Sequence, residues 1–440
     1  MKNLRKFVAV VLATGIMSTS LIPTQATEIT TESATSYEFD FFGYEDHLNE
    51  ELPAYVQEAR RLMEIQSRAV EAYNIIMEDF LSDEGGLIYP DTYAGAFVDY
   101  DTLVIQLTDI SYEETSFYTN LLGNDAPIRF KEVMFSLNQL NTFGRIFTET
   151  LNAEIVSIGV DIMANTFSIE LDIEHEDSVH AMENINTFKR FMPIPIDISS
   201  VERVVIGPAA IEMSISPATV EMGISPAFTN FNVHGGDRIN VGSLHGSLGF
   251  FGTFNGRDVA LISGHVAILG SGGQPVVNII HHATNQSIGT LSSNFQLGTT
   301  SGGGDWAIVD LNAYGRAVAN NRVARGSVTI QDRILTIPVG AMAEGFGGAS
   351  NVRYFGTVSA LRDVFTPENI PGRPTFTGQI FVNRSFSSPV PLGGDSGGPI
   401  WSMNAGRVSA AGILTGTRGT DIFVFNPFVQ ISPRFEPLRW

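Results

Sequence analysis

The spacing of apolar residues changes several times along the first half of the chain. Apolar side chains recur every three to four positions, with charges between them, in three stretches that this spacing predicts to be helices: residues 50–81, 130–151 and 176–191. Residues 93–108 instead mix alternating and continuous β-branched residues around Asp-Tyr-Asp, and residues 155–173 do the same around Ala164-Asn165. Each of these two stretches predicts a strand–turn–strand hairpin. Residues 40–205 are therefore expected to be α+β.

Short apolar runs separated by glycine-rich turns begin at Val233 and continue toward the C-terminus. The runs follow one another about every 8–15 residues, which is typical of an all-β barrel or sandwich. No long helix is predicted among them. Between the two halves, EMSISPA (212–218) recurs as EMGISPA (221–227). Its prolines and small residues predict an extended linker over residues 206–230.

The first 26 residues have the composition of a secretory signal peptide. Three of the first six residues are basic, residues 7–17 form an apolar run, and Thr-Gln-Ala at 24–26 offers small residues before a cleavage point. The apolar run is too short to cross a bilayer as a helix, and no later segment approaches the roughly 18 apolar residues of a membrane span. A short buried helix is the alternative interpretation. We expect a secreted protein that loses residues 1–26.

Charge is divided unequally between the two halves, within a net charge of −21 at pH 7. Residues 1–230 hold 36 acidic and 12 basic residues, whereas residues 231–440 hold 11 acidic and 14 basic residues. This asymmetry predicts that the two halves dock on each other, although independent domains of unrelated composition would also produce it. The chain has no cysteine, which excludes disulfides and thiolate metal sites.

Ser396 is a candidate nucleophile, because it is the one hydroxyl in the glycine-rich stretch GGDSGGPIW (393–401). A serine hydroxyl is a poor nucleophile near neutral pH and needs a base, a role that imidazole suits. His265 is the best candidate base, since it follows an apolar run in VALISGHVAIL (259–269), where a buried strand should meet a loop.

The other histidines of the second half are weaker candidates. His234 and His245 lie in polar or glycine-rich sequence and are expected at the surface. His281 and His282 are adjacent, so on a strand they would face opposite sides, which argues against a shared metal ion.

A catalytic histidine needs an acid that fixes its tautomer and stabilises the imidazolium. Asp305 in SGGGDWAIVDL (301–311) is the best candidate, because a glycine loop precedes it and an apolar strand follows it. Asp310 is the competitor, but it lies past the strand interior. His265, Asp305 and Ser396 follow one another in the chain order of the chymotrypsin triad.

Three sequence blocks resemble the signature blocks of chymotrypsin-fold serine proteases: SGHV (263–266), GDWAIV (304–309) and GDSGGP (394–399). The stretch from GGD to GSLGF (235–250), ahead of ISGH, resembles the start of the mature enzyme in the streptogrisin and α-lytic protease branch. The two hairpin sequences of the first half resemble the strand–turn–strand units of that branch's pro-region. The resemblance is strongest in the three blocks and loose elsewhere.

The resemblance implies two six-stranded antiparallel β-barrels over residues 231–440, preceded by an α+β pro-region of two subdomains over residues 27–230. It implies a Ser-His-Asp endopeptidase that acts through an acyl-enzyme, with a pro-region that assists folding and inhibits. Backbone N–H groups of Gly394 and Ser396 would form the oxyanion hole. The backbone of a substrate would pair with the strand at Leu414, Thr415 and Gly416, and Asp395 would brace the loop through a backbone amine or an arginine.

The sequence also departs from the family pattern. Val266 and Leu392 stand where family members usually carry cysteine, and no acidic residue precedes Asp395 in RSFSSPVPLGGDS (384–396). A trypsin-like acidic specificity pocket is therefore not expected. Related alternatives are a glutamyl-endopeptidase-like or HtrA-like protease, although those relatives usually have asparagine at the place of Asp395.

Two further alternatives come from other classes of protein: a non-catalytic binding module on a protease scaffold, and a structural or adhesive protein whose acidic first half binds a surface. For the protease, we expect polypeptide substrates, the chain's own pro-region as a partner, and a monomer after processing. No cofactor, metal, nucleic-acid partner or membrane partner is expected. Self-cleavage is expected between about residues 225 and 234, in the proline-rich junction.

Overall fold

The computed structural model describes residues 53–82, 86–150, 155–172, 185, 195–201, 232–271, 277–296, 303–365, 375–431 and 435–438. The signal segment, most of the helix predicted over 176–191 and the linker at 206–230 lie outside these residues. Strands make up most of the regular structure that is described, so the protein is mainly β. No helix in these ranges is long and apolar enough to span a membrane.

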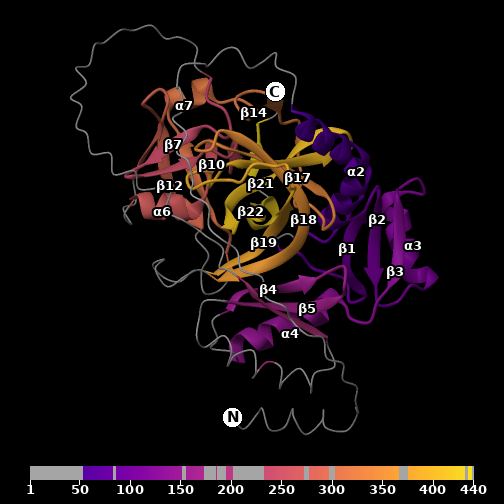
Figure 1. The fold of residues 1–440 in the computed structure, drawn as a ribbon. Coiled ribbons are helices and arrows are strands. Elements are labelled where there is room, and N and C mark those ends of the chain that lie inside the picture. The colour runs from indigo at the N-terminus through magenta and orange to yellow at the C-terminus, as the bar shows by residue number, and fades with distance from the viewer. Residues whose placement is uncertain are drawn as a thin grey trace, which may run out of the picture.

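The first part of the chain contains a long helix and a small sheet, which appear at one side of the molecule in Figure 1. The elements are α2 (Ala54–Asp79), β1 (Tyr93–Asp99), β2 (Thr102–Leu107), α3 (Tyr112–Leu122) and β3 (Ile128–Glu132). The helix predicted over residues 50–81 and the hairpin predicted over 93–108 are confirmed. The hairpin turns at Tyr100, whose φ is 58°, and β3 pairs in parallel with β2.

The helix predicted over residues 130–151 begins later than expected. It is α4 (Leu137–Thr150), and residues 130–132 of the predicted helix belong instead to β3. Ile128 and Phe130 alternate with Arg129 and Lys131, and this two-residue period puts the apolar side chains on the inner face of a strand.

A second hairpin follows α4 and confirms the prediction for residues 155–173. It consists of β4 (Ile155–Asp161) and β5 (Thr166–Asp172), with Asn165 at a φ of 53° in the turn. β6 (Ile196–Val201) pairs in parallel with β5.

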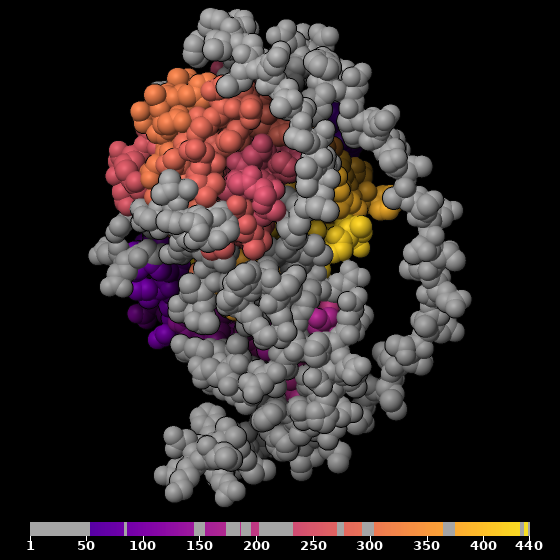
Figure 2. Space-filling view, turned by 90° about the vertical axis from the view of Figure 1, so that its left-hand side faces the viewer, coloured from indigo at the N-terminus to yellow at the C-terminus, as the bar shows by residue number. Residues whose placement is uncertain are grey.

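An eight-stranded antiparallel sheet begins the second half of the chain. Its order is β23-β9-β10-β13-β12-β11-β7-β8. The strands are β7 (Arg238–Val241), β8 (Leu244–Ser247), β9 (Phe251–Phe254), β10 (Arg257–Ile262), β11 (Asn278–His281), β12 (Gln286–Gln296), β13 (Trp306–Leu311) and β23 (Phe435–Pro437). Two short helices, α6 (Gly264–Ser271) and α7 (Ala313–Val318), lie beside it, and β14 (Arg322–Val323) and β15 (Val328–Thr329) form a separate ribbon. Figure 2 shows residues of this sheet gathered on one face of the molecule.

Six further strands pair into a closed ring, in the order β17-β20-β21-β22-β19-β18 and back to β17. They are β17 (Met342–Gly347), β18 (Val352–Phe365), β19 (Thr375–Arg384), β20 (Pro399–Asn404), β21 (Arg407–Arg418) and β22 (Ile422–Pro427), and all six pairings are antiparallel. β16 (Asp332–Arg333) adds to β21, and α8 (Phe428–Ile431) follows β22. The two sheets therefore differ from the expected pair of six-stranded units, because the first has eight strands and its described pairings do not close.

The first half of the chain continues the second sheet. β4 pairs with residues 361–364 of β18, so β4, β5 and β6 extend the sheet beyond the ring (Figure 1). One apolar cluster contains Val70 and Phe97 from the first half together with Tyr354 and Phe425 from the ring. The two halves thus share a sheet and a core, which is a closer association than the docking that their opposite charges predict.

Two side-chain amides of α2 also pair with the backbone ahead of β17. Gln66 donates through Nε2 to Gly340 O at 3.1 Å and accepts from Met342 N at 2.9 Å. Asn74 Oδ1 accepts from Leu335 N at 3.0 Å. These bonds satisfy backbone groups before and at the start of β17 that would otherwise be buried and unpaired.

Gln66→Ala is expected to lower the free energy of unfolding by about 1–3 kcal/mol, because it leaves one backbone donor and one acceptor without partners in a buried place. Urea unfolding of the full chain in a Ser396→Ala background measures the change. Glu64→Ala is the matched control, since Glu64 is exposed on the same helix and should change stability by less than about 0.5 kcal/mol. Equal effects of the two substitutions would contradict this role for Gln66.

Candidate active site

His265 and Asp305 form a buried hydrogen-bonded pair. His265 lies in the first turn of α6, directly after β10, and Asp305 directly precedes β13, which pairs with β10. The ring Nδ1 of His265 donates to Asp305 Oδ2 at 2.8 Å, and the backbone N of His265 donates to Asp305 Oδ1 at 2.8 Å. Because the carboxylate accepts from Nδ1, the basic lone pair of the imidazole is on Nε2.

The local structure around His265 differs from the predicted strand-to-loop junction. The strand ends at Ile262, and residues 264–271 are helical rather than a continuation of the apolar strand. Ser263 and Gly264 provide the break. This short connection fixes His265 next to the pairing of β10 and β13, so the base and its acid come from neighbouring strands.

A chain of buried polar side chains supports Asp305 from behind. Asp305 N donates to Asn426 Oδ1 at 3.1 Å, and Gln379 Nε2 donates to the same oxygen at 2.7 Å. Thr415 Oγ1 donates to Gln379 Oε1 at 2.7 Å. All four of these residues are 0% exposed, so these hydrogen bonds are shielded from water. In a protein interior hydrogen bonds are stronger than in water, and a polar group left without a partner there is costly.

Ser396 stands at the other end of this chain of contacts. Its hydroxyl donates to the carbonyl oxygen of Thr415 at 3.4 Å. The candidate nucleophile and the candidate acid are therefore linked by two side chains, Gln379 and Asn426, that sequence reasoning missed. The only signal in the sequence was a polar residue inside an otherwise apolar strand, as in FVFNP (423–427).

The loop before Ser396 is fixed by the buried carboxylate of Asp395. Its Oδ1 accepts from the backbone N of Ala349 and Ser350 at 2.9 and 2.8 Å, and its Oδ2 accepts from Leu392 N at 2.8 Å. Burial raises the pKa of Asp395, and these donors oppose that rise. Asp395 is thus paired with three backbone amides and not with an arginine.

Gly394 has a backbone conformation that glycine adopts more readily than other residues. Its φ is +94°, in a region that side chains rarely adopt, and its carbonyl accepts from Ser247 Oγ at 2.9 Å. Among the hydrogen bonds of the described chain, none has the backbone N of Gly394 or Ser396 as its donor. Two N–H groups of one tight loop are therefore available to stabilise a developing negative charge.

The segments that carry His265 and Ser396 lie against each other. A Cβ placed on Gly397 would come within 3.0 Å of Ser263 N, and Ser247 N donates to Ser396 O at 2.8 Å. No hydrogen bond joins His265 Nε2 to Ser396 Oγ, and Nε2 is buried without a partner in the described structure. Catalytic hydrogen bonds are often long without substrate and tighten in the reacting complex.

The predicted substrate-binding strand is β21, and its residues differ in availability. Leu414 N donates to Gly398 O and Leu414 O accepts from Gly397 N, both at 2.8 Å, so its backbone is already paired. From Gly416 to Arg418 the strand pairs with β22 on one side, and no described strand pairs with it on the other; Thr415 lies at an irregularity just before. That open edge begins where Ser396 contacts Thr415.

The remaining histidines lie deeper than expected. His234 and His245 are partly buried rather than at the surface, and burial lowers the pKa of His234. His281 is buried, with Nε2 at 3.4 Å from Asp237 Oδ2. No group of three or more His, Cys, Asp or Glu side chains within the described ranges is arranged to hold a metal ion.

Comparisons with known proteins give matches only among solved structures, since no family model and no curated protein matches the chain. A glutamic acid specific serine protease, which utilizes a novel histidine triad in substrate binding, is 21% identical over 45% of this chain and 95% of that one, with a TM-score of 0.35. Thermobifida fusca protease A is 20% identical over 48% of this chain and 100% of that one, with a TM-score of 0.36. A Nocardiopsis protease is 20% identical over 45% and 93%, with a TM-score of 0.34. Sequence identities and TM-scores as low as these do not assign a function to this chain. The function must therefore be inferred from this chain's own residues.

Gln379→Leu is expected to lower kcat about tenfold to a hundredfold, because Asn426 and Thr415 lose their common partner and the acid shifts from its place. The pH profile of kcat/KM should also change, since a misplaced Asp305 stabilises the imidazolium less. Asn383→Leu, on the exposed part of the same strand, is the control. A loss of thermal stability with an unchanged pH profile would mean that Gln379 only supports the fold.

Proposed function

We propose that the chain is a serine endopeptidase with His265, Asp305 and Ser396 as its triad. The observation that carries the proposal is the Asp305 carboxylate on Nδ1 of His265, which leaves a buried, unpartnered Nε2 in a segment packed against the Ser396 loop. A base of this kind has no evident structural purpose. It is the arrangement that a serine hydroxyl needs to become a nucleophile.

The chemistry follows from these groups. Ser396 Oγ attacks the scissile carbonyl while His265 Nε2 takes its proton, and the negative charge on the former carbonyl oxygen is stabilised by the N–H groups of Gly394 and Ser396. Each such donor is worth about 3 kcal/mol in the transition state. The imidazolium then gives its proton to the leaving amine, which departs and leaves an acyl-enzyme. Water deprotonated by the same histidine hydrolyses the ester and restores Ser396.

We further propose a chymotrypsin-like arrangement of residues 231–440, with residues 27–230 as a removable pro-region in a secreted precursor. Support comes from the closed ring of six antiparallel strands and from the pairing of β4 with β18. Strand pairs far apart in sequence form slowly. A first half that adds strands to β18 and places α2 along β17 would bring such pairs together sooner.

Two alternatives predict different outcomes. A glutamyl-endopeptidase-like or HtrA-like protease would use the same triad, and only its substrate preference would differ. A non-catalytic binding module on the same scaffold would lack a reactive serine, although the chain retains all three candidate residues of the triad.

A fluorophosphonate probe tests the proposal, because it reacts only with a serine activated by its base. We expect the processed protein obtained from the full chain to be labelled on Ser396 and the Ser396→Ala variant to remain unlabelled. Ser387→Ala is the matched control, since Ser387 is an exposed hydroxyl in the same connection and should not affect labelling. Absence of labelling in the processed wild-type protein would overturn the proposal.

A further inference from the structure

Three charged side chains meet where the first half of the chain touches the ring of strands. Glu170 on β5 accepts from Arg418 Nη1 and from the Ser157 hydroxyl. Its other oxygen lies 3.7 Å from Arg362 Nη2. One carboxylate of the first half therefore binds two arginines of the second half, and the three side chains are 5% to 13% exposed.

The two arginines belong to the ring, although the hairpin that carries Glu170 also contacts Arg362, whose Nη1 donates to Ser168 Oγ at 3.0 Å. Arg362 is on β18 and Arg418 is the last residue of β21, and both guanidinium groups lie over the ring of Phe381, at 6.0 and 5.0 Å from its centroid. An aromatic face attracts such cations and holds them in place. Phe381 would still contact both cations if Glu170 left, whereas the bond from Arg362 to Ser168 would be lost with the hairpin.

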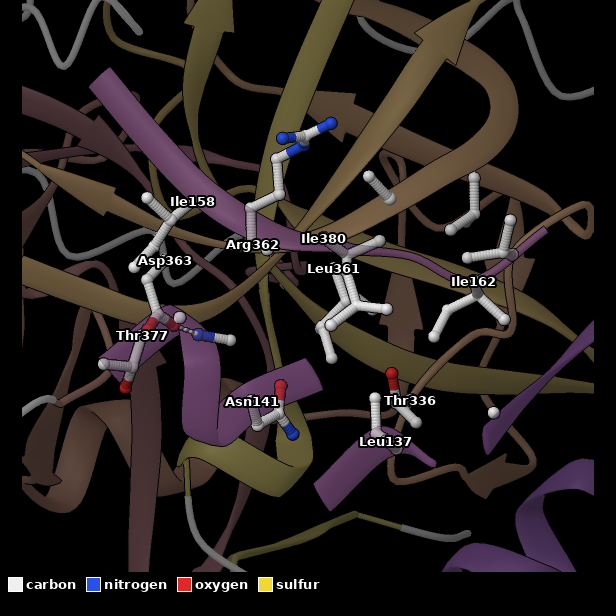
Figure 3. Close-up of a pocket in the computed structure, with 18 of the residues that line it drawn as sticks. Leu137, Asn141, Ile158, Ile162, Thr336, Leu361, Arg362, Asp363, Thr377 and Ile380 are labelled. Carbon is white, nitrogen blue, oxygen red and sulfur yellow. Dashed lines mark hydrogen bonds between the residues drawn. The ribbon is translucent and has the colours of Figure 1, made fainter. Parts of the chain in front are cut away.

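The hairpin that supplies Glu170 is incompletely packed on the ring. A cavity of about 620 Å³ lies between α4, β4 and the ends of β18 and β19. Figure 3 shows Leu361 and Ile380 beside Asn141 around this space, while the Arg362 guanidinium points away from Asn141. Atoms that line a void lose dispersion contacts. Strand pairing and the Glu170 cluster therefore add to the apolar contacts of the shared core in attaching this hairpin.

Arg418 also stands on the open edge of β21. It follows Thr415, the contact of Ser396, by three residues, which is ~10 Å along a strand. A peptide that pairs antiparallel with this edge and presents its scissile carbonyl to Ser396 would have its fourth residue before the scissile bond opposite Arg418. Side chains of opposed residues lie on the same face of a sheet, so that residue would meet both arginines.

We propose that Arg362 and Arg418 form a carboxylate-binding subsite, which Glu170 fills in the precursor and an acidic residue four positions before the scissile bond fills in a substrate. The proposal rests on the proposed protease function and on release of the first half. Two guanidinium groups that share one carboxylate make charge-assisted hydrogen bonds, which are about twice as strong as neutral ones. A glutamine at the same substrate position would bind less tightly, because it brings no charge to the two cations.

The test compares two peptides with the processed enzyme obtained from the full chain. A peptide that the enzyme cleaves is made with glutamate or glutamine at the fourth position before the cleaved bond. We expect kcat/KM to be about tenfold to a hundredfold higher for glutamate, and the difference to shrink as salt is raised. Arg418→Gln should abolish the preference, so that the ratio of kcat/KM for the glutamate and glutamine peptides falls to about one. Arg407→Gln, at the exposed other end of the same strand, is the control of equal charge.

The outcomes separate this proposal from the one on which it depends. Equal cleavage of the two peptides by the wild-type enzyme would overturn the subsite and leave the protease intact, with the ion cluster acting only between the two halves. Cleavage of neither peptide, together with no fluorophosphonate labelling, would overturn the protease function and the subsite with it. If Arg418→Gln fails to fold, Arg362→Gln and the wild-type ratio still decide the matter.

Discussion

Asp305→Asn is expected to lower kcat by about 10⁴-fold, the size of effect known for the equivalent change in a Ser-His-Asp triad. Asp305 Oδ1 accepts from the backbone N of His265, and Oδ2 accepts from Nδ1. An asparagine would keep its oxygen on the backbone N–H and turn its NH₂ toward Nδ1. The ring would then have to accept at Nδ1 and carry its proton on Nε2, where it cannot take the proton of Ser396.

Single-turnover and steady-state kinetics on a peptide substrate would measure this loss. Asp310→Asn is the matched control, because Asp310 is the other aspartate of the same strand region and lies 2.7 Å from exposed Arg257. That surface ion pair should be worth less than about 1 kcal/mol, and kcat should stay within a factor of two or so of wild type. A comparable loss in both variants would contradict the assignment of Asp305 as the acid.

Ser396→Ala is expected to remain a full-length precursor in a host that lacks other proteases. Cleavage of the junction requires the nucleophile, and alanine removes it without disturbing the loop, which Asp395 and Ser247 hold through backbone contacts. Intact mass and gel mobility would show whether residues before the second half are still attached. The Ser387→Ala precursor should be processed like wild type.

The structure restricts the position of the bond that is cleaved in the junction between the two halves. Val233 is 0% exposed, and the backbone N of His234 donates to Asp237 Oδ2 at 2.7 Å. A protease needs an extended, accessible segment, so we expect the new N-terminus at or before residue 232 instead of as far as 234. N-terminal sequencing of processed protein would locate it. Cutting of Ser396→Ala at the same bond and to the same extent would mean that another protease performs the step.

The spacing of apolar residues along the chain was enough to predict the helices and hairpins in which that spacing is regular. The three-to-four spacing before residue 81 marks α2, and the two hairpins are visible from alternation around Tyr100 and Asn165. The start of α4 was missed, because residues 128–132 follow a two-residue period over only a few positions. The apolar run through His265 was similarly misjudged, since a short apolar stretch fits a strand or a helix equally well.

Long-range pairing could not be predicted from such patterns. β4 and β18 lie some two hundred residues apart, and nothing in either sequence specifies the other as its partner. The same limit applies to the site. His265, Asp305 and Ser396 stand in sequence contexts that indicate chemistry, whereas Gln379 and Asn426 gain their role only when β19 and β22 come together behind Asp305.

The three backbone donors on Asp395 bear on how the proposed precursor would be kept inactive. Within the described residues, the hydrogen bonds that hold the Ser396 loop come from residues 247–415, and they are present while the first half is still joined to the chain. Removal of the first half, as proposed, would therefore not require the new N-terminus to move into the molecule and build the Ser396 loop. If the proposed pro-region keeps the precursor inactive, it would do so by obstructing the site, and its removal should release activity with no slow conformational phase after the cut.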